Sequence, residues 1–118
     1  MAIRLVRLYT GDDGESHFTD GQVELGPPDA PNARSGVESA ATVTFEESAR
    51  GSSLSWHTAP ERQYVITLSG TLEFETRLGE RFTVAPGDVL LAEDTTGGGH
   101  RWRLVDDQPW RRVYVALR

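Results

Sequence analysis

Apolar and polar residues alternate with a period of two through almost the whole chain, and turn residues interrupt the alternation at short intervals. Alternate side chains of a β-strand point to opposite faces, so this period is typical of strands that bury one face. Strands are expected at residues 3–8, 17–25, 37–46, 54–57, 63–69, 71–76, 81–84, 89–92, 101–105 and 111–117. So many short strands favour an all-β barrel or sandwich, because closure removes sheet edges that would pair with other chains.

Length and composition limit the chain to a single domain, residues 1–118. A chain of 118 residues can bury one hydrophobic core but not two. No apolar run approaches the roughly 18 residues that a membrane-spanning helix needs. The first residues lack the apolar segment and the small-residue cleavage site of a signal peptide. We therefore expect a cytoplasmic protein without a membrane partner.

The charge distribution and the lack of cysteine exclude several classes of site. The net charge is −6, and acidic and basic residues are interspersed, so there is no basic stripe to bind the phosphates of nucleic acid. Without cysteine the chain has no disulfide, no thiol nucleophile and no thiolate metal ligand. Nucleic acid is therefore not an expected partner.

A set of residues with fixed spacing in the middle of the chain is a more specific indicator of the fold than the alternation is. Gly51 is followed after five residues by His57, and Ala59 and Gln63 come next. Six residues then separate Gln63 from Gly70. A second segment, residues 85–100, reads APGDVLLAEDTTGGGH and closes on a histidine.

These two segments resemble the two sequence motifs of the cupin superfamily, small β-barrels that carry a metal or a ligand in the mouth of the barrel. The first family motif reads G, x5, H, x, H, x3 or x4, E, x6, G, and its two histidines and its glutamate are metal ligands. In this chain Ala59 stands at the second histidine and Gln63 at the glutamate. The resemblance implies one cupin-type double-stranded β-helix, or jelly-roll barrel, with a degenerate metal motif.

The second family motif reads G, x5, P, x, G, x2, H, x3, N, and the chain matches it in part. Gly97 and His100 fit its end, whereas Thr95 stands at the proline and Leu104 at the asparagine. Gly87 lies two residues further upstream than the motif requires. The stretch WHTAPERQYVITLSG and the ending D-T-T-G-x-G-H are similar to a bacterial subgroup of single-domain cupins. This resemblance is specific for the fold and not for a reaction.

Alternation along two strands predicts which side chains face the barrel interior. If Gln63 occupies the glutamate position of the family, its face of the strand lines the interior. The inward set is then Gln63, Val65, Thr67, His100, Trp102 and Leu104. We expect His57, Gln63 and His100 to converge in an apolar pocket, a setting typical of small-molecule sites. Contacts with a small-molecule ligand or substrate are expected from Gln63, Val65, Thr67 and Trp102.

A carboxylate precedes the glycines of the second segment. Asp94 lies six residues before His100, and three glycines loosen the backbone between them. Such a loop could bring Asp94 beside His100 and orient the imidazole. Alternatively, Asp94 caps its own turn through backbone N–H groups. If Asp94 reaches His100, we expect His100 to act as general acid and His57, neutral because it is buried, as general base.

The histidines have two interpretations at this point. Two imidazoles and the amide oxygen of Gln63 could hold Fe, Mn, Ni or Zn weakly, with water completing the shell. The metal ligands would then be His57, Gln63 and His100. His17 would complete a three-histidine face if the N-terminal strand folded over the barrel mouth. Otherwise His17 is a surface histidine, and the other two are neutral, hydrogen-bonded groups in a pocket for an organic ligand.

Three functions from different classes fit this pocket. The first is a small-molecule enzyme in which His57, His100 and Asp94 perform acid–base isomerase, lyase or cyclase chemistry and Gln63 positions a carbonyl or hydroxyl. The second is a divalent-metal-dependent cupin enzyme, with the metal as Lewis acid or as a dioxygenase-like centre. The third is a non-catalytic cupin that binds or senses a small ligand.

The resemblance also implies a homodimer, because cupins commonly pair through sheet edges and exchanged N-terminal strands. Residues 3–8 form an apolar strand, and little else in the chain is expected to cover it. We therefore expect this strand to contribute to a contact between two copies of the chain.

Overall fold

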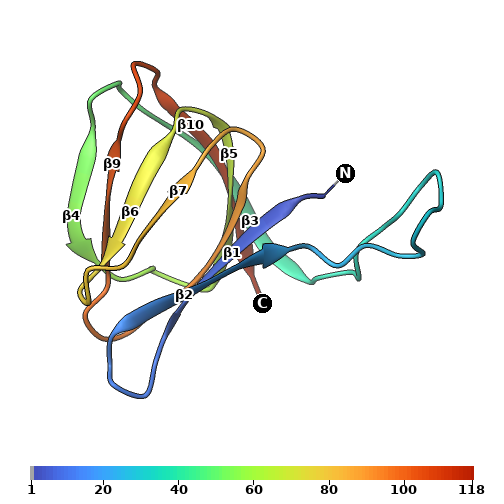
Figure 1. Cartoon of the computed structure of the whole chain (residues 1–118), viewed down its shortest axis with the longest axis horizontal. Coiled ribbons are helices and arrows are strands. Elements are labelled where there is room, and N and C mark those ends of the chain that lie inside the picture. The colour runs from blue at the N-terminus through green and yellow to red at the C-terminus, as the bar shows by residue number, and fades with distance from the viewer. Residues whose placement is uncertain (1) are drawn as a thin grey trace.

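The computed structural model describes residues 2–118 as an all-β protein (Figure 1). Nothing in this range is helical, and thus no helix there is long and apolar enough to cross a membrane. The strands are β1 (Arg4–Thr10), β2 (Ser16–Gln22), β3 (Ala40–Ser48), β4 (Ser53–His57), β5 (Gln63–Ser69), β6 (Leu72–Thr76), β7 (Arg81–Val84), β8 (Val89–Glu93), β9 (His100–Leu104) and β10 (Trp110–Leu117). The fold class predicted from the alternation is confirmed.

The strands form two sheets that face each other across a common interior (Figure 1). The six-stranded sheet has the order β2-β1-β8-β5-β10-β3, and the four-stranded sheet has the order β4-β9-β6-β7. Every neighbouring pair is antiparallel except β1 with β8, which is parallel. Sheet neighbours such as β3 and β10 are far apart in sequence, so the two halves of the chain interlock as in a jelly roll.

Because apolar and polar side chains alternate along the strands, the apolar ones pack into one core between the two sheets. On β5 the side chains of Gln63, Val65 and Thr67 are buried, whereas Leu68 on the opposite face is exposed. A strand with one buried face has this pattern because successive side chains leave it on opposite sides. The core consists of Val6, Leu8, Ala59, Val65, Leu72, Phe74, Phe82, Val84, Leu90, Ala92, Trp102, Leu104 and Trp110.

The N-terminal strand is covered by its own chain, contrary to the expectation for residues 3–8. Strand β1 pairs with β2 on one side and with β8 on the other. Val6 and Leu8 are fully buried in the core. The parallel pairing with β8 supplies the cover, and local sequence carries no signal for a pairing across so many residues. The expectation that β1 needs a second copy of the chain to cover its apolar residues is therefore wrong.

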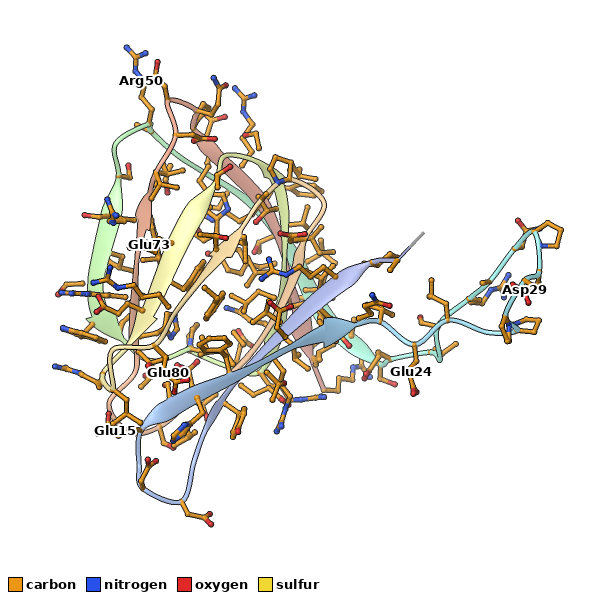
Figure 2. All side chains as sticks on the ribbon, viewed as in Figure 1. Glu15, Glu24, Asp29, Arg50, Glu73 and Glu80 are labelled. Atoms are coloured by element: carbon orange, nitrogen blue, oxygen red, sulfur yellow. The ribbon has the colours of Figure 1, made fainter. Side chains whose placement is uncertain are left out.

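The segment between β2 and β3 extends away from the barrel, and Figure 2 shows Asp29 within it, remote from the two sheets. Residues 26–36 contain three prolines, which cannot donate to a sheet ladder. They form only an isolated bridge between Gly26 and Arg34. Strand β3 accordingly begins at Ala40 rather than at residue 37.

Candidate functional site

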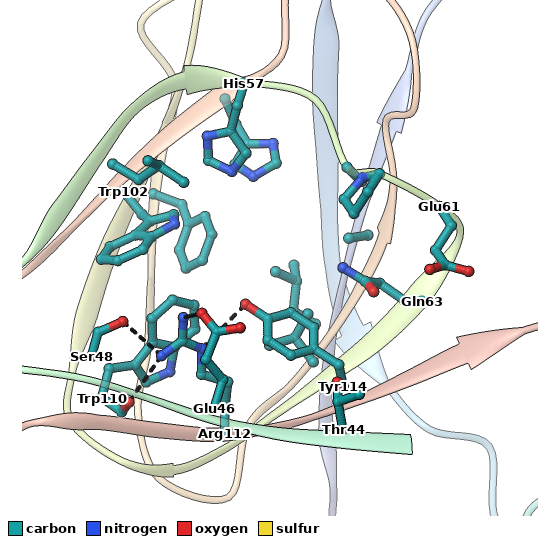
Figure 3. A pocket seen from close by; sticks show the side chains of 18 of the residues that line it. Thr44, Glu46, Ser48, His57, Glu61, Gln63, Trp102, Trp110, Arg112 and Tyr114 are labelled. Carbon is teal, nitrogen blue, oxygen red and sulfur yellow. Dashed lines mark hydrogen bonds and ion pairs between the residues drawn. The ribbon is translucent and has the colours of Figure 1, made fainter. Parts of the chain in front are cut away.

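A cavity of about 590 Å³ lies between the two sheets. Strands of both sheets line it, and its apolar wall includes Val65, Phe74, Leu90, Trp102 and Trp110. Polar side chains gather at two places in this wall. Figure 3 shows His57 at one end of the cavity and a second polar group at the other. The second group consists of Glu46, Ser48, Arg112 and Tyr114.

Strands β4 and β9 place two histidines side by side. His57 and His100 are direct partners in the antiparallel register. Their ring centroids lie 4.4 Å apart, and the ring planes are inclined by 60°. Both side chains line the cavity, and His100 is only 4% exposed. The predicted convergence of these two histidines is confirmed.

Asp94 lies directly behind His100, as the loop argument predicted. Its Oδ2 is 2.6 Å from His100 Nδ1, and it also accepts a hydrogen bond from Ser16 Oγ at 2.6 Å. The Asp94 side chain is fully buried, and Oδ1 has no hydrogen-bond partner within residues 2–118. A buried carboxylate beside Nδ1 selects the tautomer with hydrogen on Nδ1 and fixes the orientation of the ring. The alternative, that Asp94 caps its own turn, is wrong.

His57 has a different environment from its neighbour. Its Nδ1 donates a hydrogen bond of 2.8 Å to the backbone carbonyl of Ser55, which leaves Nε2 as the nitrogen with a lone pair. Burial lowers the pKa of His57, the Ser55 carbonyl partly opposes this, and the nearby His100 lowers the pKa further. The two imidazoles therefore have different hydrogen-bond partners, a backbone carbonyl for His57 and a buried carboxylate for His100.

Other predicted contact residues divide into those that reach the cavity and one that does not. Gln63, Val65 and Trp102 line the cavity as expected, and no hydrogen bond to the Gln63 side chain is found in the described part of the chain. Thr67 is buried, but its Oγ1 accepts a hydrogen bond of 3.2 Å from Trp110 Nε1 and it does not line the cavity. The prediction of Thr67 as a contact residue is wrong because the large indole of Trp110 covers it.

His17 does not join the other two histidines. It lies on β2, where Ser16 points into the interior and His17 therefore points out. Its Nε2 is 2.9 Å from Asp13 Oδ2, and its ring stacks on Tyr9. The three-histidine face is therefore wrong, and the alternative of a surface histidine describes His17.

Sequence reasoning missed Arg112, which lies inside the barrel with only 2% of its side chain exposed. Nη1 donates to Ser48 Oγ at 2.9 Å and to the Trp110 carbonyl at 3.0 Å. Nε donates to the Tyr114 hydroxyl at 3.2 Å, and Nη2 donates to Glu46 Oε2 at 2.7 Å. The guanidinium also lies 3.9 Å from the centre of the Trp110 ring. Figure 3 shows this network on the cavity wall.

A local signal for Arg112 does exist in the sequence. Period two along β10 places residues 110, 112, 114 and 116 on one face, and a buried tryptophan marks that face as interior. The charge of an arginine argues against burial unless acceptors are present. Two of those acceptors, Glu46 and Ser48, come from β3, which is remote in the sequence.

The family motif implies a metal site at His57, Gln63 and His100. Residues 2–118 contain no group of three or more His, Cys, Asp or Glu side chains placed to hold a metal ion. Ala59, at the position of the second motif histidine, is buried and apolar. Catalytic metal centres usually have three protein ligands of imidazole, thiolate or carboxylate type. His57, His100 and the neutral amide of Gln63 do not fit a centre of that type.

Comparison with known proteins gives independent support for the fold. No family model matches the chain, and no curated protein matches it. A Cupin 2 conserved barrel domain protein from Salinispora arenicola CNS-205 matches 82% of this chain and 75% of its own, with 20% identity and a TM-score of 0.54. An uncharacterized conserved protein with a double-stranded β-helix domain, from Klebsiella pneumoniae, matches 69% of this chain and 75% of its own, with 19% identity and a TM-score of 0.51.

A cupin superfamily protein from Desulfitobacterium hafniense DCB-2 also matches 69% of this chain and 75% of its own, with 15% identity and a TM-score of 0.51. At such low identities a structural likeness establishes a fold and not a reaction. The shared feature is the barrel of two facing sheets, which the two sequence motifs also predicted. The chain is therefore a small protein with the cupin-type double-stranded β-helix fold.

Proposed function

We propose that the cavity is the active site of an enzyme that transfers protons on a small molecule, in an isomerisation, elimination or cyclisation. The observation that carries this proposal is the pair of imidazoles 4.4 Å apart, of which only one contacts a buried carboxylate. Reactions of this kind need a base and an acid of different charge state at the same place.

The two histidines have distinct roles in this proposal. His57 is the general base, because burial lowers its pKa and its Nε2 lone pair is free of the Ser55 hydrogen bond. His100 is the general acid, because its Nδ1 contacts the buried carboxylate of Asp94, which orients the ring. Asp94 is a positioning residue, since it touches His100 and does not line the cavity. Gln63 lines the same cavity and supplies an amide to orient a carbonyl or hydroxyl.

Hydrogen–deuterium exchange tests the proposal before the natural substrate is known. The protein is incubated in D2O with a panel of small ketones, 2-oxo acids and unsaturated carbonyl compounds, and loss of C–H signal is followed by NMR. We expect catalysed exchange for at least one compound and a loss of about 10²- to 10⁴-fold in rate for His57→Gln, the usual contribution of general acid–base catalysis. His17→Gln is the matched control, and it should leave the rate unchanged.

The pH dependence of this exchange provides a second readout. His57 accepts a proton only when it is neutral, so the rate should fall as acidification protonates it. Because burial lowers its pKa, the fall should begin below the ordinary histidine value of about 6.5. Tight binding of the compounds with no exchange at any pH would contradict the proposal and favour a non-catalytic binding protein.

We also propose that the chain forms a homodimer through the outer face of β5, β10 and β3. Val113 on β10 lies between Ile66 and Phe45 in the register. Val115 lies in the same way between Tyr64 and Val43. Phe45 is 76% exposed and Val43 is 56% exposed. A contiguous apolar face of this kind typically marks a contact with another protein surface.

Sedimentation of the intact chain and one variant tests this interface. The intact chain should sediment as a dimer at micromolar concentration, and Phe45→Glu should sediment as a monomer because it buries a charge in the apolar contact. Leu78→Glu changes an equally apolar, exposed side chain in the turn between β6 and β7, and it should remain a dimer. A monomeric intact chain would contradict the proposal.

A further inference from the structure

Within residues 2–118 the guanidinium of Arg112 has one charged partner, Glu46, whose side chain is largely exposed to solvent. Ser48, the Trp110 carbonyl and the Tyr114 hydroxyl are neutral acceptors. Glu46 supplies the single negative charge, through Nη2. The Glu46 side chain is 58% exposed, whereas the Arg112 side chain is 2% exposed. A carboxylate that reaches in from solvent can leave again without breaking the packing of the core.

The Tyr114 hydroxyl adds a second donor at the same place. It accepts a hydrogen bond from Arg112 Nε, so its own hydrogen is available, and within the described residues it donates to no protein group. Tyr114 and Arg112 both line the cavity. If Glu46 turned away, Arg112 Nη2–H and the Tyr114 O–H would together face the cavity as a pair of donors. Such a pair suits the two oxygens of a carboxylate.

An aromatic wall separates the end of the cavity that holds Arg112 and Tyr114 from the histidines. Phe74 lies 5.8 Å from the His100 ring and 6.3 Å from the Trp110 ring, measured between centroids. Trp102 packs edge-on against Trp110 at 4.7 Å. A ligand that reaches both ends of the cavity therefore crosses flat apolar surface, which suits an aromatic or unsaturated carbon framework.

We propose that Arg112 and Tyr114 form the binding site for a carboxylate of the substrate, with Glu46 occupying that site in the free protein. The substrate class is then a small carboxylic acid with an aromatic or unsaturated middle part. Its reacting group lies at the histidine end. That the ligand is a substrate rests on the proposed proton-transfer function. The carboxylate site itself can be tested by binding alone.

The charge of the cavity favours a carboxylate over a phosphate. Arg112 is the single arginine among the described residues that line the cavity, and Glu46 and Glu61 also line it. One positive charge balances a monoanion. A dianionic phosphate would lack a second cation there.

Equilibrium titration with three probes tests the site. Benzoate, benzamide and phenyl phosphate are titrated into the full-length protein, and the Arg112 Nε–H and aromatic signals are followed by NMR. Benzoate should bind in the cavity at least about tenfold more tightly than benzamide, the affinity that one hydrogen bond to a charged group provides. Phenyl phosphate should bind no more tightly than benzoate.

The decisive variant is Glu46→Gln, because it removes the competing carboxylate from an exposed strand without disturbing the core. It should tighten benzoate binding by about tenfold, since the guanidinium then has no charged partner of its own. Glu47→Gln is the matched control. Glu47 is the next residue and pairs with Arg111 on the outer face, so this variant should leave benzoate affinity unchanged.

Three outcomes separate this inference from the proposed function. Equal affinity for benzoate and benzamide, or no tightening in Glu46→Gln, overturns the carboxylate site whatever the exchange assay shows. Benzoate discrimination together with tightening in Glu46→Gln supports the site. Benzoate binding with no proton exchange of any compound in the intact protein would contradict only the proton-transfer function.

Discussion

Gly99→Ala is expected to destabilise the protein severely, by on the order of 4 kcal/mol in the free energy of unfolding. Gly99 has φ of 75°, a left-handed conformation that alanine adopts at a cost. A Cβ atom at this position would also lie 2.2 Å from the backbone carbonyl oxygen of His57. Neither backbone can move without separating β4 from β9, and with them the two histidines. Urea denaturation followed by circular dichroism measures the loss.

Gly51→Ala is the matched control for this prediction. Gly51 has φ of 80°, but a Cβ atom there would meet nothing within 4 Å. The stability that Gly51→Ala loses should therefore be limited to the cost of the left-handed conformation, about 1–2 kcal/mol. Equal losses in the two variants would mean that the close approach of Gly99 to His57 contributes nothing to stability.

The second large effect is expected for Trp110→Ala, which should lower the free energy of unfolding by about 3–5 kcal/mol. It should also weaken the binding of benzoate beside Arg112. Trp110 is 2% exposed and packs between Trp102, Phe74 and the Arg112 guanidinium. Its removal leaves a cavity in the core and takes away the aromatic face on which Arg112 lies. Urea denaturation and benzoate titration measure the two consequences separately.

Trp56→Ala is the comparison for Trp110. Trp56 is partly exposed and lies between the guanidinium groups of Arg77 and Arg101, at 4.2 and 4.8 Å from its ring centre. Its removal opens no cavity in the core, so the loss should be about 1 kcal/mol, the value of exposed cation–π contacts. A loss as large as that of Trp110→Ala would contradict the assignment of the larger effect to core packing.

Local pattern was sufficient for the strands and for much of the site. Residues 63–69 and 81–84 were expected as strands and form β5 and β7 with the same bounds. The inward direction of His100 and Trp102 follows from period two along β9, and both are buried. The contact between Asp94 and His100 was one of two alternatives that the sequence left open, the other being a turn cap, and the structure decides for the contact.

Errors arose where a side chain's environment depended on a strand remote in sequence. Thr67 has the alternation of a cavity residue, but Trp110 of β10 covers it. His17 was a candidate ligand only if its strand folded over the barrel mouth, and β2 instead buries Ser16 and turns His17 outward. Arg112 resembles a surface residue until β3 places Glu46 and Ser48 against it.

The all-β class, most strand positions, the cupin-type spacing and the faces of most strands could be predicted from the sequence. These properties depend on alternation and turn residues, which act over a few neighbouring positions. The faces that share the cavity and the charges that meet inside it depend instead on how the strands are arranged in space. The order of strands in the two sheets brings β3 beside β10 and β1 beside β8, and such long-range pairings leave no periodic trace in the segments that make them.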